Sequence, residues 1–228
     1  MCGRFTLIAP FEYLIYRFQI KHASGEARYQ PNYNVAPGQN IVAVVNSSGG
    51  NRMGFLRWGL IPSWAKDEKI GWKLINARAE SIAEKPSFRH AFRRRRCLIV
   101  ADSFYEWTHQ TPREKVPFRF VMKSGSLFAM AGLWDSWQTK DQQLIHSCTI
   151  ITTEANSIMR PIHDRMPVIL NHEDEARWLN ASSDPKKLLD LLRPYDSGQM
   201  DCYEVSRDVN SPRNNAPYLI EKQQTHHE

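Results

Sequence analysis

Residues 97–134 read CLIVADSFYEWTHQTPREKVPFRFVMKSGSLFAMAGLW, and this stretch decides the fold class. Three of its segments are short, apolar and rich in β-branched or aromatic residues, which is typical of strands: 97–101, 117–123 and 127–134. The sequence KSGS at 123–126 predicts a hairpin turn between the last two. No helical segment alternates with these strands, so the pattern favours an antiparallel sheet over a parallel one.

The rest of the chain extends this pattern. Strand character recurs on both sides of the stretch, in residues 41–45, 54–60 and 145–153. Helical spacing is confined to 11–18, 171–179 and 183–192, where Asp184 is the expected cap and Pro185 the first helical residue. We therefore predict an α+β fold: a single domain with a curved, barrel-like, mainly antiparallel sheet core and peripheral helices.

Length and composition fit one globular domain. The chain has 228 residues, of which 42% are hydrophobic, enough to bury a core. No linker divides it, so we expect one domain over 1–222 and a frayed polar tail over 223–228. No run approaches the roughly 20 apolar residues of a membrane span, and the N-terminus lacks a signal-peptide pattern. We expect a cytoplasmic monomer without a membrane partner.

The cysteines give no sign of a metal or a disulfide framework. Cys2, Cys97, Cys148 and Cys202 are far apart and form no C-x-x-C pair. We therefore expect no metal site and no cofactor.

The charge balance points to an anionic partner. The net charge is +6 and the pI is about 9.2, and a positive surface concentrates polyanions such as nucleic acids. The seven tryptophans are expected mostly in the core, except Trp64, whose setting between Pro62 and Lys66 indicates an exposed loop able to stack on a base. Of the arginines in 93–96, we expect at least two to be solvated rather than part of a phosphate track, because a buried strand follows.

The N-terminal sequence Met1-Cys2-Gly3-Arg4 has a chemical meaning of its own. Methionine is generally removed before a small residue, and Cys2 would then carry a free α-amine and a thiol on adjacent carbons. The amine can condense with an aldehyde to an imine, and the thiol can close onto the same carbon to give a thiazolidine. Taken alone, a small residue at position 2 that happens to be cysteine is the simpler interpretation.

Four further segments supply polar groups. YNVAP (33–37) is a turn in which Asn34 can bond the backbone and Pro37 fixes φ. In LINARAES (74–81), Asn76 and Arg78 are two residues apart, so in extended structure both face one side and can grip sugar and phosphate together.

The other two segments carry titratable groups. ADSFYEW (101–107) surrounds Glu106 with aromatics, which predicts a raised pKa and a role in proton transfer. IHDRMPVIL (162–170) offers His163 and Arg165 just before another strand. Each residue also has a purely structural interpretation, and singly that interpretation is the better one.

Together, six segments in this order resemble the SOS-response-associated peptidase family, the abasic-site-crosslinking proteins. The resemblance runs from Cys2 to about residue 220, on MCGRF (1–5), YNVAP (33–37), WGLIPSW (58–64), INARAE (75–80), RRCLIVADSFYEW (95–107) and IHDRMP (162–167). It implies a single domain with a barrel-like antiparallel core that crosslinks abasic sites in single-stranded DNA through a thiazolidine, shielding the lesion in the DNA damage response.

The resemblance also implies residue roles. Cys2 corresponds to the nucleophile, Asn76 to the amide that orients deoxyribose and cysteine, Glu106 to the acid/base, and His163 to a second proton-transfer group that serves crosslink reversal or strand cleavage. The implied DNA-binding residues are Arg4, Asn34, Pro37, Trp64, Arg78 and Arg165, with Pro37 and Trp64 as an apolar wedge. Ser103 stands where many members of the family have Gly. Around residues 85 and 86, some relatives carry a phosphate-binding basic residue, and this chain reads Lys85-Pro86, to which we assign no role.

Two other functions stay open from the sequence. A cysteine peptidase, or self-processing autoprotease, would use the Cys2 thiol with His163 as base and Glu106 as orienting group. It would not need several arginines beside its nucleophile, whereas a phosphate binder would. A passive single-strand binder held by charge and stacking would leave Cys2 unexplained.

Overall fold

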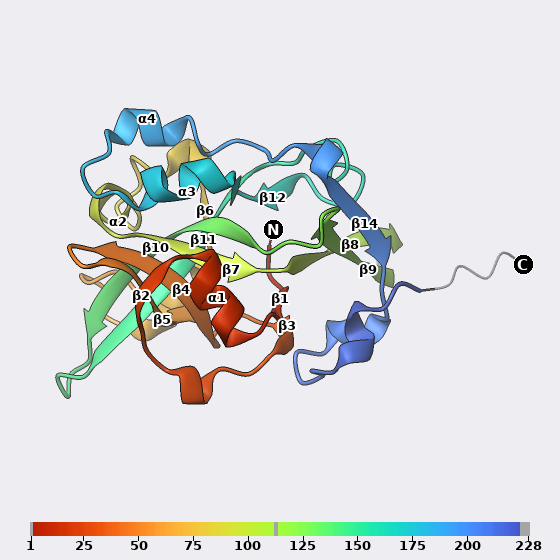
Figure 1. The fold of residues 1–228 in the computed structure, drawn as a ribbon, viewed down its shortest axis with the longest axis horizontal. Helices are drawn as coiled ribbons and strands as arrows, with labels where there is room; N and C mark the ends of the chain where they lie inside the picture. The colour runs from red at the N-terminus through yellow and green to blue at the C-terminus, as the bar shows by residue number, and fades with distance from the viewer. Residues whose placement is uncertain (1, 112–113, 224–228) are drawn as a thin grey trace, which may run out of the picture.

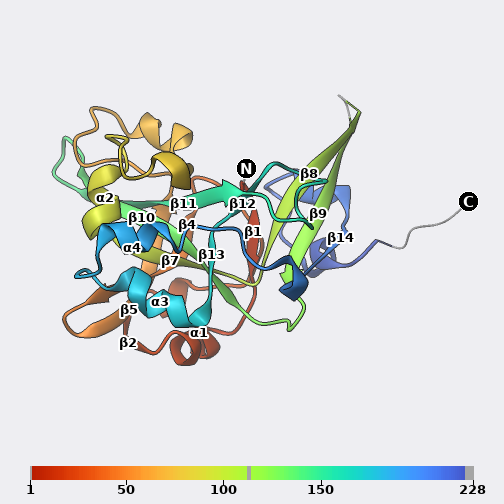
Figure 2. The ribbon, with the colours of Figure 1, turned by 90° about the horizontal axis from the view of Figure 1, so that it is seen from above.

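Two sheets form the core of the chain, for which a computed structural model describes residues 2–111 and 114–223 (Figures 1 and 2). The first sheet has five strands in the order β14 (Met200–Glu204), β9 (Glu114–Met122), β8 (Ser103–Thr111), β1 (Phe5–Leu7) and β3 (Asn32–Val35). The path of the second runs through β12 (Arg165–Pro167), β11 (Leu144–Glu154), β10 (Phe128–Gln138), β7 (Arg96–Ala101), β4 (Asn40–Ser47), β5 (Gly50–Trp58) and β2 (Ile20–Ala23). Two short strands join it, β13 (Ile169–Leu170) beside β10 and β6 (Asn76–Arg78) beside β11.

The second sheet closes on itself. β5 pairs in parallel with β11 through Arg57 and Ser147, so that β11, β10, β7, β4 and β5 form a ring. Most other pairings are antiparallel. The predicted α+β domain with a barrel-like, mainly antiparallel core is therefore confirmed.

The pleat of the strands divides the core into two layers. Along β7, Cys97 and Ile99 belong to the same buried cluster as Cys2, whereas Leu98 and Val100 face the cluster that the helices cover. This alternation follows from the two-residue period of a strand. It places Cys2 between the barrel and the five-stranded sheet.

The helices lie at the periphery, as predicted. They are α1 (Phe11–Arg17), α2 (Arg89–Arg94), α3 (His172–Leu179) and α4 (Pro185–Leu189). Asp184 caps α4 by accepting from the Lys186 N–H, and Pro185 opens it. α1 and α3 lie side by side (Figure 2), joined by the ion pair of Arg17 with Glu175 at 2.7 Å. No helix in the described ranges is long and apolar enough to span a membrane.

The hairpin predicted at KSGS is wrong. The Gly125 N–H does bond the Met122 carbonyl in a turn, but β9 and β10 do not pair with each other. β9 lies between β8 and β14, and β10 lies between β7 and β11. The turn therefore passes the chain from one sheet to the other.

The arginine run divides as expected. Arg93 and Arg94 are exposed, which confirms that at least two are solvated. Arg95 forms an ion pair with Asp135, and Arg96 is buried, with its guanidinium bonded to backbone carbonyls such as that of Trp178 at 2.6 Å. The predicted tail lies, apart from residue 223, outside the described residues.

The tryptophans lie mostly in the core or packed against it, and Trp72 is the exception that was not expected. Trp58 and Trp178 are fully buried, and Trp64 is exposed as predicted. Trp72, however, is 57% exposed, and the remaining three are only partly buried. Local sequence did not reveal this, because the burial of a large ring depends on which distant segment covers it.

Candidate functional site

Cys2 lies three residues before β1, an inner strand of the five-stranded sheet. β1 pairs with β3 on one side and β8 on the other, through Phe5 with Val35 and with Phe104. The Cys2 side chain is fully buried. Burial raises the pKa of its thiol far above the usual range, and the Glu106 carboxylate raises it further. The thiol is therefore neutral at rest and faces Glu106.

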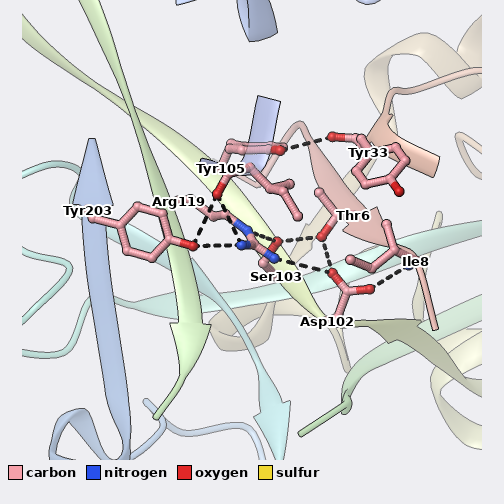
Figure 3. A network of polar contacts seen from close by, with 9 residues as sticks. Thr6, Ile8, Tyr33, Asp102, Ser103, Tyr105, Arg119 and Tyr203 are labelled. Carbon is pink, nitrogen blue, oxygen red and sulfur yellow. Dashed lines mark hydrogen bonds and ion pairs between the residues drawn. The ribbon is translucent and has the colours of Figure 1, made fainter. Parts of the chain in front are cut away.

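A polar network holds β1 against β8 (Figure 3). Thr6 in β1 bonds Asp102 and Ser103, and the Arg119 Nε donates to the Ser103 hydroxyl at 2.8 Å. Arg119 also donates to the Tyr203 hydroxyl at 2.6 Å, which ties β14 to the same network. Ser103, where many relatives of the resembled family have Gly, thus supplies a hydroxyl that fixes the two strands.

Glu106 lies in β8, directly after Tyr105, whose backbone bonds the residue before β1. The Tyr105 N–H donates to the Arg4 carbonyl at 2.9 Å, so the next residue, Glu106, lies beside the Cys2–Gly3 segment. Its side chain is only 3% exposed. Burial raises the pKa of Glu106 to about 7, with a smaller contribution from Asp164. The raised pKa predicted from its aromatic surroundings is confirmed.

Asn76 is brought to this region by β11. β6 pairs with β11 in parallel, Asn76 beside Ile150 and Arg78 beside Thr152, and β12 pairs with the same end of β11 from the other side. Both polar atoms of the Asn76 amide are buried, and neither finds a hydrogen-bond partner within the described chain. Buried amides are nearly always bonded. A role of Asn76 in holding a ligand stays a prediction.

His163 reaches the site from the turn before β12. Its Nδ1 accepts the Arg165 backbone N–H at 2.9 Å, which leaves the proton of the neutral ring on Nε2. The same nitrogen lies 2.9 Å from the Asp164 carboxylate. Because Asp164 also acts on Glu106, the turn lies near β8. The ring can therefore donate or carry a proton there.

Of the four groups predicted for chemistry, the structure thus brings Cys2 and Glu106 together through β1 and β8. It delivers Asn76 and His163 through β6 and β12, which flank one end of β11. Figures 1 and 2 both show β12 close to β1 and β8. Within the described ranges, no cluster of three or more His, Cys, Asp or Glu residues is arranged to hold a metal ion.

The three predicted arginines differ in their availability. Arg78 is exposed. Arg4 is half-buried, and its guanidinium donates to Asn34 at 2.7 Å and to the Val209 carbonyl at 2.9 Å. Arg165 is 9% exposed and donates to both carboxylate oxygens of Glu80, at 2.5 and 3.0 Å. Of the three, Arg78 alone is exposed.

Asn34 is used within the protein. It is 1% exposed, and its amide nitrogen donates to the carbonyls of Ser211 and Asn214 at 3.0 and 2.8 Å, while its oxygen accepts from Arg4. The side chain therefore ties the C-terminal segment to Arg4. Direct contact of Asn34 or Arg165 with DNA stays a prediction.

Pro37 and Trp64 are not adjacent in sequence or in setting. Pro37 is partly exposed, beside Gly38. Trp64 is 57% exposed and lines a groove with Pro86, Arg89 and His90. Its segment is anchored by the Ile61 N–H, which donates to the Ser147 hydroxyl in β11. Ser147 precedes Ile150, the residue of β11 paired with Asn76, by three residues, or about 10 Å along the strand. Direct contact of Trp64 with DNA stays a prediction.

Sequence reasoning missed two residues at this site. Glu80 follows the INAR segment and holds Arg165, which lowers the pKa of the Glu80 carboxyl. Trp72 precedes the same segment and is exposed. The only local signal for Trp72 was its setting between Gly71 and Lys73.

Comparison with known proteins agrees with this geometry. The family model described as SOS response associated peptidase (SRAP) matches residues 1–212. The abasic site processing protein YoqW of Bacillus subtilis is 55% identical over 222 residues, 97% of this chain and 99% of that protein. The abasic site processing protein HMCES of Xenopus tropicalis is 33% identical, over 83% of this chain and 65% of its own length.

A solved structure gives the same result. A crystal structure of a protein from Bacteroides thetaiotaomicron superposes with a TM-score of 0.89 at 30% identity, covering 98% of this chain and 100% of that one. The residues that build the site, Cys2, Asn76, Glu106 and His163, all lie within the matched range 1–212. The chain therefore belongs to the SOS response associated peptidase (SRAP) family.

Proposed function

We propose that this chain processes abasic sites in single-stranded DNA by forming a thiazolidine crosslink through Cys2 once Met1 has been removed. The observation that carries the proposal is the meeting of Cys2 with a carboxyl group whose pKa is about 7, Glu106. The relatives named abasic site processing proteins support the substrate class.

The reaction needs an aldehyde, an amine and a thiol. The sugar at an abasic site opens when the proton of its C1′ hydroxyl moves to the ring oxygen, which frees the aldehyde. The Cys2 amine adds to that carbon, and loss of water gives the imine. The thiol then forms the S–C bond while its proton passes to nitrogen. The sum is one thiazolidine and one water, with no oxidant or reductant.

Each proton transfer has a candidate group. A carboxyl with a pKa of about 7 is protonated in half of the molecules at neutral pH, so Glu106 can protonate the departing hydroxyl and accept the thiol proton. His163 is the second candidate, and the unpartnered amide of Asn76 can hold the sugar hydroxyl or ring oxygen.

A peptidase is less well supported. A cysteine peptidase attacks as a thiolate, so its environment lowers the thiol pKa. Here burial and Glu106 both raise the pKa of Cys2. A neutral thiol suits the second step of thiazolidine formation, in which an imine has already been made. A passive binder would not need the Cys2–Glu106 pair.

Intact mass spectrometry tests the proposal directly. After mixing with a single-stranded oligonucleotide carrying one abasic site, the adduct should have the mass of the chain without Met1 plus the oligonucleotide minus one water. A matched oligonucleotide with a tetrahydrofuran spacer has no aldehyde and should give no adduct. Adduct formation by protein that retains Met1 would contradict the mechanism, because a blocked amine cannot form the imine.

We expect Arg78→Ala to weaken binding to undamaged and abasic single strands alike. Arg78 is exposed beside Asn76, and each phosphate contact on a single strand contributes about 0.7 to the slope of log K against log salt. Fluorescence anisotropy over a salt series measures both quantities. Arg52→Ala, an exposed arginine on β5 paired with β2, is the control and should change neither. Unchanged affinity in Arg78→Ala would make Arg78 an ordinary surface charge.

A further inference from the structure

Trp72 presents a large apolar ring to solvent shortly before the segment that carries Asn76. It is 57% exposed, at the end of the 3-10 turn Glu68–Lys73 and four residues before Asn76. Four residues of chain span at most about 14 Å. An exposed tryptophan this close to the unpartnered amide of Asn76 calls for a physical explanation.

The outer edge of the Trp72 six-membered ring contacts the turn that carries Pro37. Gly38 has a φ of +86°, and a Cβ there would lie 2.5 Å from Trp72 Cη2, so only glycine permits both the turn and the contact. The Gly38 N–H donates to the Trp58 carbonyl at 2.8 Å, which fixes the turn on β5. The Trp72 ring is therefore held by contact with the backbone of Gly38, next to Pro37.

The backbone beneath Trp72 is equally fixed. Gly59 and Gly71 approach so closely that a Cβ on either would lie 2.8 Å from the carbonyl oxygen of the other. Gly59 itself has a φ of +128° and donates to the Cys148 carbonyl of β11 at 2.8 Å. The turn that carries Trp72 is thus set directly on the barrel.

An aromatic ring that is fixed by a backbone contact and exposed to solvent elsewhere can stack on a flat partner at low entropic cost. A ring that is already ordered loses little further freedom when a flat partner covers its open face. Lys69 and Lys73 precede and follow Trp72 in the sequence, and both are exposed, as is Arg78. Three exposed cations in one short stretch suit a phosphodiester strand. Bases in single-stranded nucleic acid stack on such aromatic platforms regardless of sequence.

We propose that Trp72, held against the Pro37–Gly38 turn, is a stacking platform for a nucleobase that flanks the abasic site in single-stranded DNA. This inference rests on the proposed function for its choice of ligand. It adds a binding residue, and it assigns the glycines at 38, 59 and 71 to holding that residue in place.

Equilibrium binding tests the platform without crosslinking. The probe is a fluorescent single strand with a central tetrahydrofuran spacer, and Kd is measured by anisotropy. Trp72→Leu should raise Kd about tenfold, and Trp72→Phe should stay close to wild type. Leucine keeps an apolar cover over Gly38 but cannot stack, so a merely structural role would be satisfied by both variants. Thermal unfolding of each variant reports its folding separately.

Two further probes identify the partner base. In one, the 5′ neighbour of the central spacer is replaced by a second spacer, and in the other the 3′ neighbour is. On one of these two probes, the Kd of the wild type should rise to the Kd that Trp72→Leu shows on the first probe. On that same probe, Trp72→Leu should not raise the Kd any further. Tyr16→Ala is the control, an 81% exposed ring on α1, at the opposite side of the molecule in Figure 2.

The outcomes separate the two proposals. An equal loss in Trp72→Leu on all three probes, or no loss on any, would overturn the platform even if wild-type protein crosslinks abasic DNA. A wild-type protein that never crosslinks would overturn the proposed function, while base-dependent binding through Trp72 would still be measurable.

Discussion

Cys2→Ser protein is expected to form no durable crosslink with an abasic single strand. The amine at position 2 remains, so an imine still forms. Without the thiol, however, the thiazolidine ring cannot close on the imine carbon. The loss should be complete in a denaturing gel without reductant. With borohydride, which reduces the imine to an amine, a crosslinked band should return.

An unprotected imine also favours β-elimination of the 3′ phosphate. Cys2→Ser is therefore expected to cut the strand where the wild type shields it. Cys202→Ser is the matched control, because Cys202 is a partly exposed free cysteine on β14. It should crosslink like the wild type. A durable crosslink by Cys2→Ser at wild-type yield would show that the thiol is dispensable and would remove the central claim.

Glu106→Gln is expected to slow crosslinking by about 100-fold, the usual scale for loss of a general acid/base. The amide keeps the shape of the side chain but cannot exchange a proton with the thiol or the departing hydroxyl. The time course of crosslinking should therefore lengthen, while the affinity for a spacer-containing strand stays unchanged. Glu12→Gln, on the exposed face of α1, is the control and should react at the wild-type rate.

The pH dependence gives this prediction a second readout. The pKa of Glu106 is about 7 in the folded protein, above the value of about 4.3 of a free glutamate. The folded state therefore binds more protons in this window, and its stability falls as the pH rises from about 4.3 through 7. Glu106→Gln lacks this loss of stability. The difference in melting temperature between Glu106→Gln and the wild type should therefore shift in favour of the variant as the pH rises from 5 to 8.

The rate profile should change in the same region. In the wild type, the crosslinking rate should inflect near pH 7, where Glu106 titrates, and in Glu106→Gln this inflection should be absent. An unchanged rate together with an unchanged profile would exclude Glu106 as the proton-transfer group and would leave His163 as the candidate.

The sequence by itself determined the elements whose signal is local. The apolar, β-branched runs gave β7, β10 and β11, and the capped segment after Asp184 gave α4. The six ordered motifs identified the family, and the aromatic setting of Glu106 predicted its raised pKa. The strands and the helix depend on neighbours within a few residues, which the sequence displays directly, whereas the burial that raises the pKa of Glu106 is set by the fold.

Only the tertiary structure decided which strands pair and which side chains are already engaged. The turn at KSGS looks like a hairpin, yet β9 and β10 enter different sheets, where each pairs with strands distant in the sequence. Asn34 is buried beneath the C-terminal segment and Arg165 is held by Glu80, while Trp72 is exposed over Gly38. All three outcomes depend on contacts between residues distant in the chain, since side-chain burial and hydrogen bonding are set by what packs there and not by periodicity.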